Sequence, residues 1–479
     1  MIHDLRPYSA YRDSGVPWLR KVPEHWEVSR LKARLLRNDA GVWGDDFDEN
    51  GTPVLRSTEQ TINGGWRIST PARIRLSQSQ RDAALLLEGD LVITKSSGSH
   101  AHIGKTSLVT RDIAAMHCCH SNFMQRLRPN GHTLPAMVWR FLNSPVGREQ
   151  MVFQSTTTTG LGNLNGTILG NCVLAFPPLP EQAAIVRFLD HADRRIRRYI
   201  RAKQKLIKLL EEQKQIIIHR AVTCGLDPNV RLRPSGVEWL GEVPEHWEVR
   251  RNGQLFAQHN QTGFAELPIL EVSLKTGVRI REFENAARKQ VMSDREKYKR
   301  AAKGDIAYNM MRMWQGAVGV APVDGLVSPA YVVARPLPGV EVRYFASLFR
   351  TAAYMGEVDN CSRGIVKDRN RLYWQDFKQS FSPYPPPAEQ VQIADAIDES
   401  TRTLQHAMDR IVREISLLRE YRTRLIADVV TGKLDVRAAA ANLPDESDEP
   451  VALDDTDAPA EGHESADSDL DAAPEEAEA

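Results

Sequence analysis

The stretch SGVPWLRKVPEHWEV, Ser14–Val28, recurs farther along the chain as SGVEWLGEVPEHWEV, Ser235–Val249. Twelve of the fifteen positions are identical, so the second stretch is a copy of the first. A second pair follows, because FPPLPEQ at Phe176–Gln182 returns as YPPPAEQ at Tyr384–Gln390. The repeat period of about 210 residues is too long for a solenoid and indicates a duplicated domain.

Each copy therefore consists of a Trp-rich entry segment, a variable region, a Pro-Pro stop and a long helical stretch. Duplication predicts pseudo-twofold symmetry, which suits a molecule that reads paired DNA half-sites. The segments predicted from this pattern are an entry segment (1–27), a first variable domain (28–180), a first helix (181–223), a second entry segment (224–248), a second variable domain (249–387), a second helix (388–433) and an acidic tail (444–479).

Long helices are predicted after Pro180 and Pro387, because proline is tolerated only in the first turn of a helix. Each helix spans about 40 residues, on the order of 60 Å. Apolar residues spaced alternately by three and four predict a heptad seam on each helix. The predicted seam positions are Leu189, Ala192, Ile196, Tyr199, Lys203, Leu206, Leu210, Gln213 and Ile217, and then Ile397, Ser400, Leu404, Ala407, Ile411, Glu414, Leu418, Tyr421 and Leu425.

So narrow a seam needs a partner helix, and the other copy in the same chain is the simplest partner. We expect antiparallel pairing within the chain, with an intermolecular coiled coil as the alternative. An offset of 208 aligns the two helix ends, VTCGLD at Val222–Asp227 and VTGKLD at Val430–Asp435.

The two variable regions carry short β-rich runs separated by Gly and Pro, which indicates α+β domains. Strands that follow Gly89 and Gly304 occupy equivalent places, and each leads through a polar loop to a glycine fifteen residues on, Gly104 and Gly319. Trp18, Trp26, Trp239 and Trp247 recur in both copies, which fits packing better than base stacking.

Two motifs suggest chemistry and are rejected. Five residues separate Gly98 from Gly104 before Lys105, whereas a phosphate-binding Walker loop has four, and the second copy has no equivalent Lys. The run His117–His120 contains two adjacent cysteines, a spacing that suits a buried strand better than a zinc site. Motifs of a methyltransferase or a nuclease are also missing, so we expect no catalytic site and no bound metal.

Charge is distributed unevenly along the chain. Residues 444–479 hold 15 Asp plus Glu and no Lys or Arg, which leaves 62 basic and 47 acidic side chains in residues 1–443. A basic body suits a polyanion partner. The tail is expected to be disordered and solvated, or else to compete with DNA for the body. Five cysteines, no long apolar run and no apolar leader predict a cytoplasmic protein without disulfides or membrane contact.

The repeated entry segments, the Pro-Pro-x-x-Glu-Gln boundaries and the Val-Thr-x-x-Leu-Asp helix ends together resemble the specificity subunit of Type I restriction-modification systems. The resemblance covers about residues 10–440 and leaves out the tail. It implies an α+β protein in which two target-recognition domains, each reading half of a split DNA site, are joined by two long antiparallel coiled-coil helices. It also implies two methyltransferase subunits that use S-adenosylmethionine, and ATP- and Mg-dependent restriction subunits, as partners.

Reading bases requires hydrogen-bonding groups at base edges and cations near phosphates. The polar loops after the two equivalent strands, and a second loop in each domain, are the predicted DNA-contact regions. The candidate residues are Lys95, Ser96, Ser97, His100, Lys105, Thr157, Thr158, Asn163 and Asn165 in the first domain, and Asn309, Arg312, Trp314, Gln315, Arg363, Lys367, Arg369 and Arg371 in the second.

Two other functions remain open at this stage. A stand-alone DNA-binding or coiled-coil adaptor in another defence or regulatory complex would keep the helices but need no methyltransferase. An enzyme with a cryptic site would show methyl transfer or cleavage by the purified chain alone.

Overall fold

The computed structural model describes residues 5–43, 47–97, 102–155, 164–281, 295–362 and 371–444, with the side chains of 154 and 155 excepted. The predicted acidic tail lies almost wholly outside these residues. The described chain divides into two compact units. Unit 1 takes residues 5–204 and 412–444, and unit 2 takes residues 205–411.

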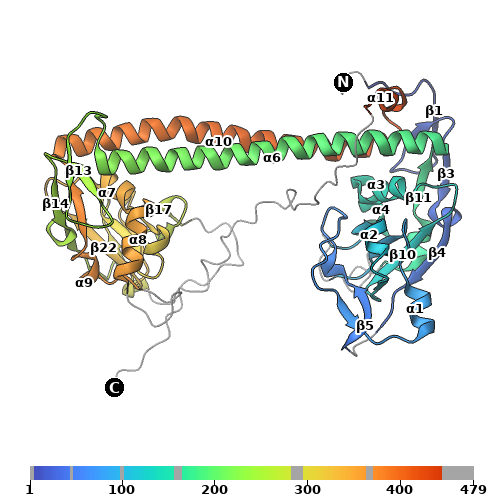
Figure 1. Cartoon of the computed structure of the whole chain (residues 1–479), viewed down its shortest axis with the longest axis horizontal. Coiled ribbons are helices and arrows are strands. Elements are labelled where there is room, and N and C mark those ends of the chain that lie inside the picture. Colours follow the sequence, from blue (N-terminus) through green and yellow to red (C-terminus); the bar gives the residue numbers. More distant parts are fainter. Residues whose placement is uncertain are drawn as a thin grey trace. The chain divides into compact units, whose positions relative to one another are not determined.

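The helices and strands of unit 1 follow the order of the chain (Figure 1). They are β1 (Tyr11–Asp13), β2 (Lys21–Pro23), β3 (Glu27–Arg30), η1 (Leu31–Arg34), β4 (Leu35–Ala40), β5 (Phe47–Leu55), η2 (Ser57–Glu59), β6 (Ala72–Ile74), α1 (Gln78–Ala84), β7 (Leu91–Thr94), β8 (Thr106–Leu108), α2 (Arg111–Ala114), β9 (Cys119–His120), β10 (Met124–Pro129), α3 (Pro135–Asn143), α4 (Pro145–Ser155), α5 (Gly166–Asn171), β11 (Val173–Phe176) and α11 (Arg437–Ala441).

Unit 2 repeats much of this order. Its elements are β12 (Leu232–Pro234), β13 (Glu242–Pro244), β14 (Glu248–Arg251), η3 (Asn252–Gln254), β15 (Phe256–Gln258), β16 (Leu270–Ser273), β17 (Gly277–Ile280), η5 (Arg295–Lys297), β18 (Lys299–Ala301), β19 (Ile306–Asn309), η6 (Met313–Gln315), β20 (Val318–Val320), β21 (Gly325–Val327), β22 (Tyr331–Pro336), α7 (Val342–Phe349), α8 (Ala352–Cys361), α9 (Trp374–Phe377) and β23 (Phe381–Tyr384).

The main sheet is the same in both units. Unit 1 has the antiparallel order β4-β10-β7-β8 and unit 2 the order β15-β22-β19-β20. The strands predicted after Gly89 and Gly304 are β7 and β19, which lie inside these sheets with buried apolar residues. A side sheet covers each one, made of β6, β5 and β9 in unit 1 and of the pairs β16-β17 and β18-β21 in unit 2. The predicted α+β class and internal repeat are confirmed.

Helices α6 (Leu179–Cys224) and α10 (Pro387–Val430) lie side by side and antiparallel (Figure 1). In unit 1, Asp193 of α6 pairs with Arg422 of α10, and Lys203 Nζ lies 2.5 Å from Glu414 Oε2. In unit 2, Lys214 Nζ donates to Gln405 Oε1 at 3.1 Å. Because residue numbers rise on one helix as they fall on the other, the predicted antiparallel pairing within the chain is confirmed.

The predicted seam is correct at every second position and wrong at most of the others. Tyr199, Leu206, Gln213, Ser400 and Tyr421 are exposed. One residue farther on in each case, the helix turns inward instead, at Ile200, Ile207, Lys214, Thr401 and Arg422, with Ile200 fully buried. Inward positions spaced by three and then four residues have the same average spacing, about 3.5 residues, as positions spaced by four and then three. The periodicity of the sequence therefore does not show which of the two sets faces the partner helix.

Each entry segment is held to a helix by one carboxylate, which is buried in unit 1 (Glu181) and partly exposed in unit 2 (Glu389). In unit 1, Glu181 accepts hydrogen bonds from Trp26 Nε1 at 2.9 Å and from Tyr8 Oη at 2.7 Å, and it lies 2.8 Å from His25 Nε2. In unit 2, Glu389 lies 2.8 Å from His246 Nε2 and accepts from Trp247 Nε1 at 3.1 Å. The adjacent His and Trp of each entry segment therefore have a structural role, and the Glu that they bond starts the following helix in both copies, 155 residues after Trp26 and 142 residues after Trp247.

Trp26 and Trp247 are each 1% exposed, which confirms packing rather than base stacking as their role. Burial and the hydrogen bond to Glu181 raise the pKa of Tyr8 well above its usual range, so this phenol stays a hydrogen-bond donor.

The glutamine of each Pro-Pro-x-x-Glu-Gln motif joins the helix start to the main domain. Gln182 Nε2 donates to Pro177 O at 2.9 Å, while its Oε1 accepts from Leu134 N, just before α3. Gln390 does the same with Pro385 O and Glu341 N. The replacement of Leu-Pro by Pro-Ala in the second copy leaves these contacts intact.

Both helices end at a glycine in the left-handed region, Gly225 (φ 77°) and Gly432 (φ 76°). Since the 208-residue offset pairs Gly225 with Lys433, the aligned motif is one residue out of register with the actual caps. Gly432 also explains why α10 stops at Val430, before the predicted end at 433. Like Gly225, it approaches the buried Trp of an entry segment closely.

Candidate nucleic-acid interface

A buried aspartate begins the central strand of each unit. Asp90, fully buried, pairs in a bidentate manner with Arg128 of β10 at 2.7 and 2.8 Å and accepts from Leu87 N. Asp305 accepts from Ala302 N and lies 2.6 Å from His259 Nδ1. In unit 1 these contacts tie the turn before β7 to the neighbouring strand β10, and in unit 2 they tie the turn before β19 to the residue that follows β15.

That loop is joined in each unit to the end of the second predicted contact region. Leu164 N donates to Lys95 O at 2.8 Å in unit 1, and Leu372 N donates to Met310 O at 2.9 Å in unit 2. Leu164 and Leu372 are separated by the same 208 residues as the helix boundaries. The fold therefore brings the two predicted contact regions of each unit together, which the sequence could not show. We call these surfaces the reading edges, made of Lys95–Ser97 with Leu164–Asn165 and of Asn309–Gln315 with Arg371–Leu372.

On the reading edge of unit 1, Lys95, Ser96 and Ser97 are half-buried, and partial burial lowers the pKa of Lys95. Asn165 is exposed and caps α5, because its Oδ1 accepts from Ile168 N at 2.8 Å. His100, Thr157, Thr158 and Asn163 lie outside the described residues.

Lys105 does not reach this edge, which corrects its prediction as a DNA contact. It is 3% exposed, and its Nζ donates to Ser57 O at 2.9 Å and to Gln60 O at 3.1 Å. Burial lowers its pKa to about 8. A lysine among backbone carbonyls fastens the loop before β8 to η2 and is turned away from any phosphate.

On the reading edge of unit 2, Asn309 Oδ1 accepts from Met311 N, so the side chain also shapes its own loop. Trp314 packs partly on the core and donates to Met311 O, whereas Gln315 is exposed. Arg312 is half-buried and Arg371 is exposed. Arg363, Lys367 and Arg369 lie outside the described residues.

The glycine predicted to match Gly104 is also corrected. Thr94 N donates to Lys105 O where Asn309 N donates to Ala317 O, so Gly104 corresponds to Gly316 and Lys105 to Ala317. Both glycines have positive φ, 74° and 88°. The loop of unit 2 is three residues shorter than equal spacing of Gly104 and Gly319 suggested.

Sequence reasoning missed two aromatic residues beside the edge of unit 1. Trp43 is 66% exposed and Phe123 is 52% exposed, and their ring centroids lie 5.6 Å apart in an edge-to-face arrangement. Phe123 O accepts from Lys95 N at 3.0 Å, so the pair adjoins the reading edge. In a sequence both residues look like core, and only the structure shows that neither is buried.

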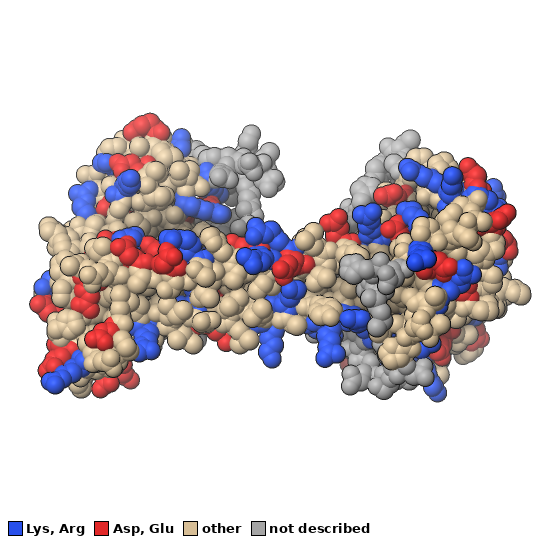
Figure 2. Space-filling model, turned by 90° about the horizontal axis from the view of Figure 1, so that it is seen from above, with Lys and Arg blue, Asp and Glu red and all other residues tan. Residues whose placement is uncertain are grey.

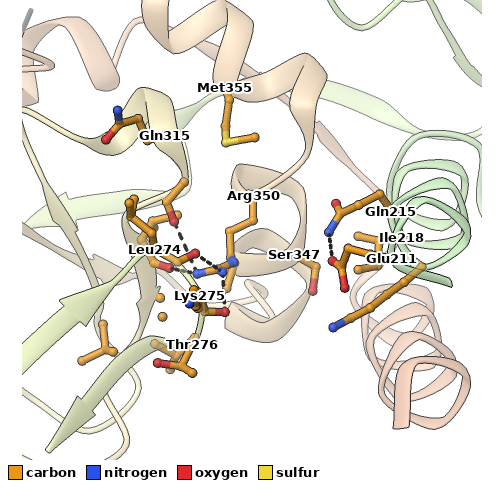
Figure 3. A pocket seen from close by; sticks show the side chains of 18 of the residues that line it. Glu211, Gln215, Ile218, Leu274, Lys275, Thr276, Gln315, Ser347, Arg350 and Met355 are labelled. Carbon is orange, nitrogen blue, oxygen red and sulfur yellow. Dashed lines mark hydrogen bonds between the residues drawn. The ribbon is translucent and has the colours of Figure 1, made fainter. Parts of the chain in front are cut away.

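Unit 2 also contains a pocket of about 780 Å³ beside its reading edge. Helix α6, the β16-β17 turn, η6 and α7 line it, and Gln315 lies on its wall (Figure 3). Arg350 forms one side and donates to the carbonyl groups of Gly316, Val318, Leu274 and Lys275 (Figure 3). Arg350 therefore holds two loops together at the side of the pocket.

The charges on the face drawn in Figure 2 are mixed. Lys and Arg side chains alternate there with Asp and Glu over the long helices and both units. Among the described residues, no cluster of three or more His, Cys, Asp or Glu could hold a metal ion. His117–His120 ends in the buried strand β9, and all five cysteines are free. No helix of the described chain is long and apolar enough to cross a membrane.

Comparison with known proteins shows which family this chain resembles. Residues 23–216 match the family model of the Type I restriction modification DNA specificity domain. The specificity subunit of the Escherichia coli K12 Type I enzyme EcoKI is 28% identical over 141 residues, 29% of this chain and 30% of its own length. The chain is a relative of the Type I specificity subunits.

The MjaVIII specificity subunit of Methanocaldococcus jannaschii is 24% identical over 233 residues, 48% of each chain. Another relative from that organism is 26% identical over 234 residues, 48% of this chain and 52% of its own. The chain thus spans about half the length, or less, of the curated specificity subunits that it matches.

The fold extends further than these sequence matches. A chain from a structural study of complex assembly and conformational transition in a type I R-M system superposes with a TM-score of 0.62 at 16% identity. The superposition covers 86% of this chain and 99% of that one. At this identity the likeness shows the fold alone, and it includes both halves of the repeat.

Proposed function

We propose that this chain is the DNA-sequence-specificity subunit of a Type I restriction-modification complex and reads a bipartite DNA site, one half-site for each unit. The observation that carries the proposal is a frame present twice with different side chains at its two reading edges. Three features recur: the Glu–His–Trp anchor (the Glu of each long helix bonded to the His and Trp of an entry segment), the Gln tie (the Gln that joins each helix start to the domain) and the four-stranded sheet. The edges differ, because they carry Lys, Ser and Asn in unit 1 and Asn, Arg and Gln in unit 2.

The chemistry of the edges fits base reading. Asn and Gln side chains can bond adenine in a bidentate way, and Arg or Lys can bond guanine. We propose Lys95, Ser96, Ser97 and Asn165 as contacts of unit 1, and Asn309, Arg312, Gln315 and Arg371 as contacts of unit 2. Trp314 supports its loop from the core side.

Partners are proposed from an exposed feature of the helices. Leu209 of α6 and Leu417 of α10 are equivalent under the 208-residue offset, and they are 50% and 63% exposed. These equivalent exposed leucines give each unit the same apolar contact site, as binding of two copies of a methyltransferase subunit would require.

In this proposal, those subunits carry S-adenosylmethionine, and restriction subunits carry ATP and Mg. The chain itself is not catalytic, and the complex acts in the cytoplasm.

The decisive experiment is to co-express the chain with candidate adenine methyltransferase subunits and to map methylated adenines across the host genome. We expect a split motif with a constant gap. Exchange of residues 31–172, which leaves β3, β11 and Glu181 in place, should change one half-site only. Absence of methylation by a stable complex with a competent methyltransferase would favour an adaptor role for the helices, and methylation or cleavage by the purified chain alone would revive a cryptic enzyme.

A further inference from the structure

We infer that Trp43 and Phe123 form an aromatic contact with base surfaces in the half-site read by unit 1. This inference rests on the proposed function, because it adds two residues to the same reading edge. Large aromatic side chains exposed next to each other are uncommon on a protein surface and mark places where something binds. Trp43 is 66% exposed and Phe123 is 52% exposed, and their two ring centroids lie 5.6 Å apart.

The backbone around the pair is built to place it. Val42 N donates to His120 O and Asn122 N donates to Val42 O, both at 2.9 Å, so the segment before Trp43 is clamped to the turn that carries Phe123. A Cβ on Gly41 would lie 2.2 Å from His120 O, so only glycine permits this approach. The two rings therefore meet because two segments far apart in sequence are held together.

The same turn is bonded to the reading edge. Lys95 N donates to Phe123 O, and Lys95 O accepts from Leu164 N, so one residue links the aromatic pair to both predicted contact regions. A duplex that touches Lys95 and Asn165 therefore lies beside the rings.

Comparison of the units assigns the pair to reading rather than to the frame. Met124 begins β10 as Tyr331 begins β22, which places Ala330 where unit 1 has Phe123. The buried tryptophans of the entry segments are present in both units. The exposed aromatic pair occurs in unit 1, whereas unit 2 has Ala330 in place of Phe123. Residues that differ between two copies of one frame are the residues that would distinguish two half-sites.

The chemistry of the contact follows from the neighbouring sequence. Neither Trp43 nor Phe123 carries a charge, so attraction to phosphates is not what these two side chains contribute. Aromatic rings contact either thymine methyl groups in the major groove or base faces at an opened step, and both are apolar base surfaces.

The test uses the full chain and a pool of DNA duplexes with a randomised core, from which bound duplexes are sequenced. Wild type should enrich a split motif. The variants Trp43→Ala and Phe123→Ala should lose sequence preference in one half-site, keep the other, and bind the enriched duplex about 5- to 150-fold more weakly for each ring that stacks on a base. The slope of log affinity against log salt should stay unchanged, whereas loss of a phosphate contact would lower it by about 1.

Leu36→Ala is the matched control, since this residue is also an exposed apolar side chain (70% exposed) and lies in β4, outside the reading edge. It should leave both half-sites intact. Because all three side chains are exposed, thermal melting should show the variants folded. Two further arms separate the two base surfaces: thymine-to-uracil duplexes test the methyl contact, and 2-aminopurine fluorescence tests an opened step.

The outcomes are distinct. If wild type enriches no motif, the proposed function fails and this inference with it. If wild type enriches two half-sites and the aromatic variants enrich the same two at equal affinity, the inference alone fails. It also fails if these variants keep DNA affinity but no longer bind the methyltransferase, because the pair would then be a protein-docking surface.

Discussion

Units 1 and 2 are built on the same sheet, the same Glu–His–Trp anchor and the same Gln tie, yet they differ in how the chain passes through them. In unit 2 the end of α6 continues through Asp227 into the second entry segment. In unit 1 the end of α10 is followed by Asp435, whose backbone pairs with Arg6 near the start of the chain. The helix end and the entry segment are thus joined by the continuous chain in unit 2 and by non-covalent contacts in unit 1. Both units nevertheless have the same anchor, so the anchor does not depend on chain continuity.

The frame itself can be broken by removing its buried tryptophan. Trp26→Ala should destabilise unit 1 by about 3–5 kcal/mol, because a fully buried indole is replaced by a cavity and Glu181 loses a donor. Trp247→Ala should do the same to unit 2. Hydrogen–deuterium exchange read by mass spectrometry should show faster exchange in the mutated unit. Equal loss of protection in both units after either change would mean that the two do not unfold separately.

A difference inside the frame comes next. Trp139 of α3 donates to Gly64 O and Thr106 O, and the equivalent residue of α7 is Ala346, which lines the 780 Å³ pocket of Figure 3. Trp139→Ala should therefore give unit 1 a similar pocket, at a cost near the lower end of about 3–5 kcal/mol because Trp139 is only half-buried. The melting temperature measures this cost.

The reciprocal change, Ala346→Trp, is the control for pocket filling. It should shift stability by less than about 1 kcal/mol, since the ring enters empty space without displacing core atoms. A large loss of stability would show that the pocket is closed in solution.

These residues also show how far sequence could go. The repeat, the proline boundaries and the alternating apolar spacing predicted two α+β units with two antiparallel helices, because each is a local signal. The inward face of the helices needed more, since Ile200 and Tyr199 fit the same average period and only packing selects one. Lys105 was predicted to contact DNA because the sequence does not show that the carbonyl groups of Ser57 and Gln60 lie beside its amino group.

The candidate site was predictable only in part for the same reason. The loop after each central strand was found from its Gly-Asp start, but the bonds that join Lys95 to Leu164 and Met310 to Leu372 depend on tertiary folding. Trp43 and Phe123 gave no signal at all, because an exposed aromatic residue and a core aromatic residue are the same letter.

The junction of the chain ends gives a smaller effect that only unit 1 should show. Val436 is fully buried and Ala440 is 2% exposed in the core of unit 1, although both follow the last long helix. Val436→Ala should destabilise unit 1 by about 1–2 kcal/mol through lost apolar burial. Truncation after Pro444 is the control and should leave the exchange protection of unit 1 unchanged. A variant as stable as wild type would mean that the junction does not hold the ends.

The smallest effect concerns a buried cation that unit 2 lacks. Lys105 has a pKa of about 8 in the folded chain, against an ordinary value of 10.5, while its counterpart Ala317 is uncharged. Between these two pH values the unfolded chain binds more protons than the folded chain, so this lysine makes stability rise with pH through that window. Lys105→Met should remove a rise on the order of 1 kcal/mol, measured as the difference between variant and wild type in denaturant unfolding at pH 7.5 and 10. Because other lysines and tyrosines titrate over the same range in both proteins, only the difference reports Lys105. An identical pH dependence would place its amino group in water, and would return Lys105 to the list of residues able to meet a phosphate.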